Sequence, residues 1–117
     1  MTDSPVADCL FCRIVAGEIP ADFVKQTDQV LAFRDIEPEA PTHVLVIPKS
    51  HYTDIGALST SDPALAGTLI VEAAGVARDL GLSEYRLVMN TGASGGQTVF
   101  HVHAHILGGR EMLWPPG

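Results

Sequence analysis

Histidines occupy every second position in a short apolar stretch near the C-terminus. They are His101, His103 and His105, and the residues between them are Val102 and Ala104. In a β-strand, successive side chains point to opposite faces, and residues two apart lie about 6 to 7 Å from each other. The pattern therefore predicts a strand with one imidazole face and one core face. Imidazoles can attack phosphorus, bind a metal ion or contact a phosphate, so this row is the first candidate for catalysis.

A glycine-rich segment leads directly into this strand. Residues 91–97 contain three glycines and end at Gln97. Glycines let backbone amides approach an anion closely, and the hydroxyls of Ser94 and Thr98 would add donors. Such a segment is by itself more often a tight connection, and a solvated edge strand can also carry histidines. Three of the five histidines in strict alternation, directly after this turn, favour a functional site.

Two cysteines, Cys9 and Cys12, form a C-x-x-C pair near the N-terminus. We expect a short helix over residues 9–16, with Asp8 as its N-cap and Gly17 as its end. Cysteines three residues apart lie on the same side of a helix and can bind one metal ion. Two buried small apolar side chains, or a redox pair, are the alternatives. A structural zinc site needs four ligands, and the spacing alone does not select its histidines among His43, His51, His101, His103 and His105.

The elements that would position these residues are one sheet and two helices. Apolar and alternating segments predict five strands, over residues 22–26, 29–34, 43–48, 85–90 and 101–107. A helical pattern over residues 62–80, with Asp62 as N-cap and Pro63 as first residue, predicts one long helix. The sequence therefore predicts an α+β domain with a five-stranded antiparallel sheet, one short N-terminal helix and one long helix.

The composition is that of one globular domain. The 117 residues are 46% hydrophobic and 18% charged, and we expect a single domain over residues 1–117 with tails at 1–7 and 108–117. The net charge of −7 argues against a nucleic-acid polymer as partner, although a small anion can bind to backbone amides and imidazoles. No apolar run is long enough to cross a membrane, and the N-terminus has no signal pattern. We therefore expect a cytosolic protein that does not bind a membrane.

Together these motifs resemble the histidine-triad family. Residues 101–107 match its signature, His-φ-His-φ-His-φ-φ, in which φ is an apolar residue. The matching segments of the Hint branch of that family are residues 33–36, 41–43, 46–49 with His51, 95–100 and 108–117. The resemblance extends from about residue 8 to residue 117, and it implies the α+β histidine-triad fold.

The resemblance implies an enzyme that hydrolyses purine nucleoside 5′-phosphoramidates. The middle histidine, His103, would attack the α-phosphorus and displace the amine, and water would then release AMP or GMP. His105 would contact the phosphate oxygens, and Gln97 and Thr98 would hold the phosphoryl group or assist the leaving group. The nucleotide-binding residues implied by the resemblance are Asp35, Ile36, Asn90, Gly96, Gln97, Thr98, His103 and His105, of which His103, His105 and Thr98 would be catalytic.

The resemblance also implies a structural zinc ion. Similar bacterial-type proteins bind zinc at the positions of Cys9, Cys12, His51 and His101, and four protein ligands leave the metal no open position for chemistry. His43 is then left over as a structural histidine.

A homodimer is a further implication of the resemblance. Hint proteins pair through the long helix, and a monomer that buries the same helix face on its own sheet is the alternative. The resemblance also implies that the C-terminal tail, residues 108–117, lies near the active site, often beside that of the partner subunit. Leu113 stands in this tail where some relatives have histidine, so the difference bears on the choice of leaving group. Small residues that would permit close packing of two helices are Ala66, Gly67, Ala73, Ala74 and Gly75.

Other functions compete with this interpretation. A dinucleoside polyphosphate hydrolase is the rival within the family, and the Hint-like tail disfavours it. A metallohydrolase would use His101, His103 and His105 to hold a catalytic metal ion. A nucleotide-binding regulatory module would bind the same ligand with only incidental turnover.

Overall fold

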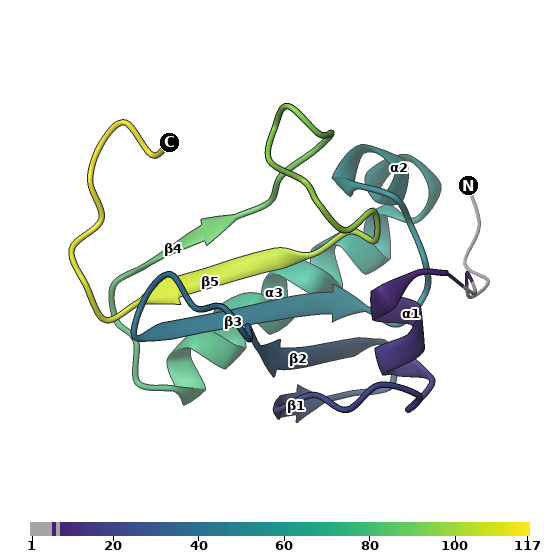
Figure 1. Ribbon diagram of the computed structural model, residues 1–117, viewed down its shortest axis with the longest axis horizontal. Coiled ribbons are helices and arrows are strands. Elements are labelled where there is room, and N and C mark those ends of the chain that lie inside the picture. The colour runs from purple at the N-terminus through teal and green to yellow at the C-terminus, as the bar shows by residue number, and fades with distance from the viewer. Residues whose placement is uncertain (1–5, 7) are drawn as a thin grey trace.

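The computed structural model describes residue 6 and residues 8–117 (Figure 1). The tail expected over residues 1–7 therefore lies, apart from Val6, outside the described residues. The helices are α1 (Leu10–Val15), α2 (Ile55–Ser61) and α3 (Pro63–Asp79), and the strands are β1 (Phe23–Gln26), β2 (Val30–Arg34), β3 (Thr42–Pro48), β4 (Tyr85–Val88) and β5 (Ala104–Gly108).

The five strands form one antiparallel sheet in the order β1-β2-β3-β5-β4. This confirms the predicted α+β fold class. In the centre of the sheet, β3 pairs with both β2 and β5, and Leu45 lies opposite His105. The long helix α3 lies along the sheet in Figure 1. It begins after Asp62, whose Oδ1 accepts the Leu65 N–H at 3.0 Å, as the N-cap pattern predicted.

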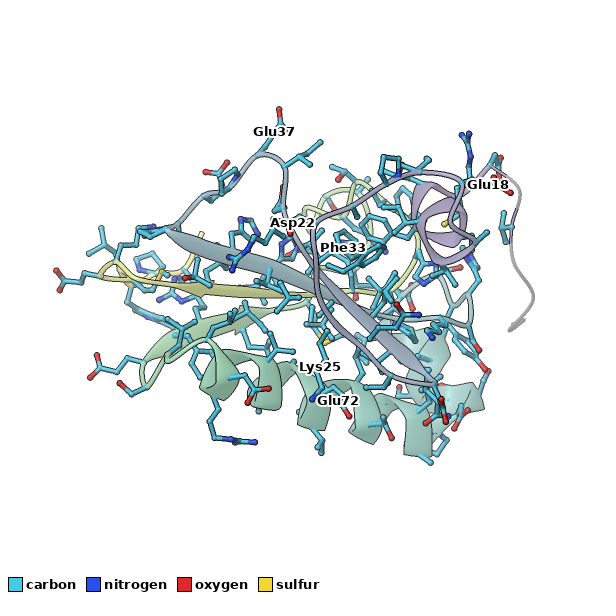
Figure 2. All side chains as sticks on the ribbon, turned by 90° about the horizontal axis from the view of Figure 1, so that it is seen from below. Glu18, Asp22, Lys25, Phe33, Glu37 and Glu72 are labelled. Carbon is cyan, nitrogen blue, oxygen red and sulfur yellow. The ribbon has the colours of Figure 1, made fainter. Side chains whose placement is uncertain are left out.

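Helices cover the sheet from both sides (Figure 2). One face packs on α3, and Val44 and Val46 of β3 contribute to that core. The alternate residues Leu45 and Ile47 belong to a second core with α1, to which Phe33 also points. Because side chains alternate along a strand, β3 is apolar on both faces and is buried between two helical layers.

A third helix, α2, was not predicted. Asp54 caps it, since its Oδ1 accepts the Ala57 N–H at 2.9 Å, and Leu58 is its buried residue. The segment is short and rich in serine and threonine, which have low helix propensity, so its sequence carries little helical signal. Among the described residues, no helix combines the length and the apolarity that a membrane span requires.

The histidine strand is shorter than the alternation predicted. It begins at Ala104, so only His105 of the three histidines lies within β5. Before it the backbone leaves the sheet, because the Val102 N–H donates to the Tyr52 carbonyl at 2.7 Å instead of to a strand. The two-face pattern still holds through the whole stretch: Val102, Ala104 and Ile106 are buried in the core under α3.

Candidate active site and metal centre

Two cysteines and two histidines come together where α1 meets the central strands. Cys9 is the N-cap of α1, and its Sγ accepts the Cys12 N–H at 3.4 Å, so the cap is Cys9 and not the expected Asp8. His51 follows β3, and His101 precedes β5. The four ligand atoms all lie within 4.8 Å of one another. The structure thus assembles the four residues that the sequence resemblance selected.

The donor atoms of this cluster match a tetrahedral metal site. The two Nδ1 atoms of His51 and His101 are 3.2 Å apart, and the Cys12 Sγ lies 3.3 and 3.5 Å from them. A tetrahedral zinc ion would place its ligands about 3.3 Å apart for two nitrogens and about 3.6 Å for nitrogen and sulfur. The geometry and the Cys₂His₂ chemistry therefore both fit zinc.

Hydrogen bonding and burial prepare His101 for this role. Its Nε2–H donates to the Pro48 carbonyl at 2.8 Å, so Nδ1 carries the lone pair that faces the sulfurs. Burial lowers the pKa of His101 to about 4, and the ring is neutral at pH 7. Burial also raises the pKa of the Cys12 thiol, and a bound cation would oppose that effect because it stabilises the thiolate.

His103 stands beside this cluster with one nitrogen engaged and one available. A backbone carbonyl can only accept, so the 2.7 Å contact between His103 Nδ1 and the His101 oxygen places the proton on Nδ1. Nε2 then carries the lone pair of a potential nucleophile. The ring is buried, which lowers its pKa. The ring of Phe11 packs edge-on against it, with 5.1 Å between centroids.

His105 is held by a chain of hydrogen bonds that begins at a backbone amide. The Glu39 N–H donates to His43 Nδ1 at 3.0 Å, so His43 carries its proton on Nε2. That Nε2–H donates to His105 Nδ1 at 2.9 Å, which leaves the His105 proton on Nε2. Burial lowers the pKa of His105 to about 4, and His103 and His43 add to the shift. At pH 7 His105 is therefore a neutral donor.

The sequence interpretation of His43 missed this connection. His43 is buried and hydrogen-bonded, as a structural histidine would be, but its partner is a residue of the site. The contact of His43 with His105 follows from the pairing of β3 with β5, which places His43 and Leu45 on the same face of the sheet as His105. That pairing is not visible in the spacing of the histidines along the chain.

A second group of possible metal ligands consists of Asp35, His43 and His105. Here the Nε2 atom of His43, 3.4 Å from Asp35 Oδ2, carries a proton, because its Nδ1 accepts a backbone N–H. A metal ion on that Nε2 would require the ring to give up this proton as well, which a neutral imidazole does only at high cost. This group is therefore held together by hydrogen bonds from His43 and not by a metal ion.

The three alternating histidines do not converge on one point. His101 faces the cysteines, His103 Nδ1 bonds a carbonyl, and His105 Nδ1 bonds His43. Among residues 8–117, neither of the two groups of possible metal ligands contains all three of these rings. The arrangement gives no support to the metallohydrolase considered from the sequence.

A cavity of about 280 Å³ opens at His103 and His105. Its wall is largely apolar, and Ile36, 93% exposed, stands at its mouth. The polar residues of the lining include Asp35, the two histidines and the exposed Thr98. The cavity thus combines apolar walls with side chains that can form hydrogen bonds. The apolar lining includes Phe11, Ile14, Ile19, Phe33, Leu45 and Val99.

The glycine-rich loop is folded on itself beside this cavity. Asn90 donates from Nδ2 to the Gly96 carbonyl at 3.5 Å. Gln97 is buried, and its side-chain amide bonds to backbone groups of the chain. Neither the backbone N–H nor the hydroxyl of Thr98 has a hydrogen-bond partner among the described residues. Of the loop residues expected in the site, which are Asn90, Gly96, Gln97 and Thr98, only Thr98 lines the cavity.

The C-terminal tail lies away from this cavity. Arg86 of β4 donates to the Leu113 carbonyl at 2.8 Å and holds the tail along the sheet edge (Figure 1). The last residues share a separate hollow with Asn90, and Trp114 is 83% exposed there. Asn90 therefore borders this hollow with its own segment and bonds to the loop through the Gly96 carbonyl.

A neutral histidine with one nitrogen available, a neutral histidine donor and an adjoining Cys₂His₂ cluster on this α+β sheet are the features of a histidine-triad protein. Comparison with known proteins agrees: the HIT domain matches residues 16–112, and the chain belongs to the HIT family. The family resemblance expected from the sequence is thus confirmed.

Related proteins cover the chain almost completely. It is 51% identical to an uncharacterized HIT-like protein of Synechocystis, with 94% of this chain and 97% of the relative aligned. It is 45% identical to a 14 kDa zinc-binding protein of Zea mays, over 100% and 91% of the two chains. The crystal structure of a HIT family hydrolase from Legionella pneumophila is 51% identical and superposes with a TM-score of 0.90, covering 94% of this chain and 100% of that one.

Removal of one cysteine should abolish metal binding. We expect the purified protein to hold about one zinc ion per chain and Cys12→Ser to hold much less, because a structural site needs all four ligands. Elemental analysis gives the stoichiometry, and a thiolate-to-Co²⁺ absorption band in the cobalt-loaded protein reports cysteine ligation. Leu10→Ala, a change on the same helix between the two cysteines, is the control and should keep the metal. Full metal content in Cys12→Ser would contradict the site.

His105 should make the fold sensitive to mild acid. Its pKa falls from 6.5 in the unfolded chain to about 4 in the folded one. The unfolded state therefore binds the proton first, and the stability from this group is complete above pH 6.5 and is lost as the pH falls towards 4. Urea denaturation at pH 7 and pH 4.5 should show a smaller loss of unfolding free energy in His105→Asn than in wild type. Equal losses would contradict the depressed pKa.

Proposed function

We propose that this protein hydrolyses purine nucleoside 5′-phosphoramidates to nucleoside monophosphates through a covalent intermediate on His103. The observation that carries the proposal is the 2.7 Å bond from His103 Nδ1 to the His101 carbonyl, which leaves the Nε2 lone pair beside a cavity suited to a nucleotide. A HIT family hydrolase among the solved relatives supports the general class of reaction.

The proposed reaction has two displacement steps. His103 Nε2 forms a bond to the α-phosphorus as the P–N bond to the amine breaks, and the amine leaves with the electron pair and takes up a proton. Water then attacks the phosphorus, the bond to Nε2 breaks, and the nucleoside monophosphate departs. Dividing one hard displacement into two easier ones lowers the barrier of each step. The neutral state of His103, which its lowered pKa favours, keeps the lone pair available for attack.

Neighbouring residues would bind the nucleotide around this nucleophile. The His105 Nε2–H and the free donors of Thr98 would hold the phosphate oxygens and stabilise charge that develops there. The carboxylate of Asp35 would accept the ribose hydroxyls, and the exposed side chain of Ile36 would pack on the purine face. Asn90 and Gly96, which bond to each other through the Asn90 Nδ2 and the Gly96 carbonyl, would contact the nucleotide near its phosphate.

We also propose that the Cys₂His₂ cluster binds structural zinc. The four ligands are Cys9, Cys12, His51 and His101, and the name of the Zea mays relative supports the choice of metal. Zinc with four protein ligands supplies cross-linking and no open position for substrate. The chain's thiols would then be held reduced as ligands, which suits a cytosolic location.

Replacement of the nucleophile should stop turnover and preserve binding. With adenosine 5′-phosphoramidate, we expect His103→Ala to release AMP more slowly by on the order of 10⁴-fold or more. Chromatographic measurement of AMP gives the rates, and intact-mass spectrometry of rapidly quenched wild type should detect a nucleotidyl adduct that the variant lacks. Circular dichroism and AMP binding show whether the variant is folded.

Each alternative has its own outcome in this experiment. A folded wild type that binds AMP without turnover would establish the nucleotide-binding module instead. Slow cleavage of the phosphoramidate together with fast cleavage of diadenosine polyphosphates would favour the polyphosphate hydrolase. Equal rates in wild type and His103→Ala would overturn the assignment of the nucleophile.

We further propose that the protein is a homodimer that pairs through α3. Ala73 is fully buried against the chain's own sheet, so the outer face of the helix is formed by other residues. On that face Ile70 and Val71 are 41% and 68% exposed, and Gly67 is exposed between them and the helix start. These side chains would be covered by the same helix of a second copy.

A charge on this face should separate the two copies. We expect light scattering to give twice the chain mass of 12.4 kDa for wild type and the single mass for Val71→Glu. A monomer would tolerate glutamate at this exposed position, so circular dichroism should be unchanged. A wild type of single mass at all concentrations would contradict the dimer.

A further inference from the structure

The buried side chain of Gln97 forms hydrogen bonds to three backbone segments, and we call this set of bonds the clasp. It is 3% exposed. Its Oε1 accepts the Gly92 N–H at 2.9 Å, and its Nε2 donates to the carbonyls of Thr53 at 2.7 Å and Val99 at 3.1 Å. Both amide hydrogens are therefore in use, and the backbone N–H of Gln97 also bonds the Gly92 carbonyl. Gln97 has no donor left for a phosphate, in contrast to the role expected from the sequence.

The clasp fixes the backbone on both sides of Thr98. On one side the Gln97 N–H is tied to Gly92, and on the other the Val99 carbonyl is tied to the Gln97 side chain. Thr98 between them has no hydrogen-bond partner of its own among the described residues, and it lines the cavity beside His103 and His105. The position of its donors thus depends on bonds made by its neighbours.

The clasp also ties this loop to the segment that carries a metal ligand. Thr53 receives the Gln97 bond, and Tyr52 receives the Val102 N–H at 2.7 Å. Both lie directly after His51. The three-residue segment 51–53 therefore bonds to the chain at Gln97 and again at Val102. These bonds fix the positions of the loop, Thr98 and His101 relative to the end of the same strand.

The loop has little freedom to compensate for a lost clasp. A Cβ atom at Gly95 would collide with the Thr91 carbonyl oxygen, and Gly92 and Gly96 have φ angles of 79° and 96° that favour glycine. A conformation of this kind is kept only while the surrounding contacts specify it. The Gln97 amide supplies three of those contacts.

We propose that Gln97 is a positioning residue that sets the Thr98 hydroxyl against the phosphoryl group and does not itself touch the substrate. The inference rests on the proposed function in that the ligand is a nucleotide with its phosphate at His103 and His105. On this proposal, Gln97 affects only the part of the binding free energy that comes from the phosphate. The base and the ribose bind elsewhere in the cavity and do not depend on it.

Calorimetric binding of AMP and adenosine tests this assignment. For Gln97→Ala we expect the Kd of AMP to rise about tenfold, the loss of roughly one charge-assisted hydrogen bond, and the Kd of adenosine to change less than about twofold. Gln97→Glu keeps the size and the acceptor for Gly92 but turns an acceptor towards the two carbonyls, so it should give the same pattern. Gln29→Ala, the same substitution at an exposed glutamine that does not line the cavity, is the control and should match wild type.

A double-mutant cycle separates positioning from direct contact. If Gln97 acts through Thr98, adding Gln97→Ala to Thr98→Ala should change the Kd of AMP by less than about threefold. A full tenfold loss in that background would mean that Gln97 contacts the phosphate itself and would overturn the proposal. Equal weakening of AMP and adenosine would do the same, because it would show a general structural role.

The experiment distinguishes this proposal from the proposed reaction. Wild type that binds AMP more tightly than adenosine, with the expected Gln97 pattern but no phosphoramidate turnover, would support the positioning role and overturn the reaction. Wild type that binds AMP no more tightly than adenosine would overturn the positioning role, whatever the turnover. Metal content equal to wild type in both Gln97 variants verifies that the segment 51–53 is intact.

Discussion

The arrangement of the site depends on His101, whose ring and backbone carbonyl have separate roles. Its ring turns away from solvent into the Cys₂His₂ cluster, where Nδ1 lies 3.5 Å from both sulfurs, and its backbone carbonyl accepts the His103 Nδ1–H. The ring of His101 thus belongs to the cluster that connects α1, the end of β3 and the approach to β5. Its carbonyl determines which nitrogen of His103 is left available. Phe11, held between Cys9 and Cys12, packs on both His101 and His103 and strengthens the same connection.

Backbone groups decide the protonation of the whole histidine row. The Pro48 carbonyl fixes the tautomer of His101, the His101 carbonyl fixes that of His103, and the Glu39 amide fixes that of His43 and through it His105. Burial lowers the pKa of the three alternating histidines, so neutral rings with assigned tautomers are the state at pH 7. These backbone groups lie at the end of β3, in the loop before β3 and in the segment before β5, so the fold around the sheet sets the protonation of the row.

Much of the fold was predictable because the side-chain period matches the secondary structure. The alternation from Val102 to Ile106 correctly placed the core face, and Asp62 and Pro63 correctly marked the start of α3. The start of β5 was not predictable, since residues 101–103 have the same alternation as a strand but the Val102 N–H bonds to the Tyr52 carbonyl instead. Helix α2 was missed because it is stabilised by the Asp54 cap and the burial of Leu58 more than by its own propensity.

The sequence by itself determined the candidate residues for the site: the histidine row, the cysteine pair, and the glycine loop that precedes the row. Residue types and local periodicity encode these features because they depend on neighbours along the chain. Only the tertiary structure decided which nitrogen of each histidine is free, that His43 supports His105, and that the Gln97 amide is consumed within the chain. Those outcomes depend on partners as far as 62 residues away in the sequence, and hydrogen bonds between such distant segments exist only once the sheet has brought them together.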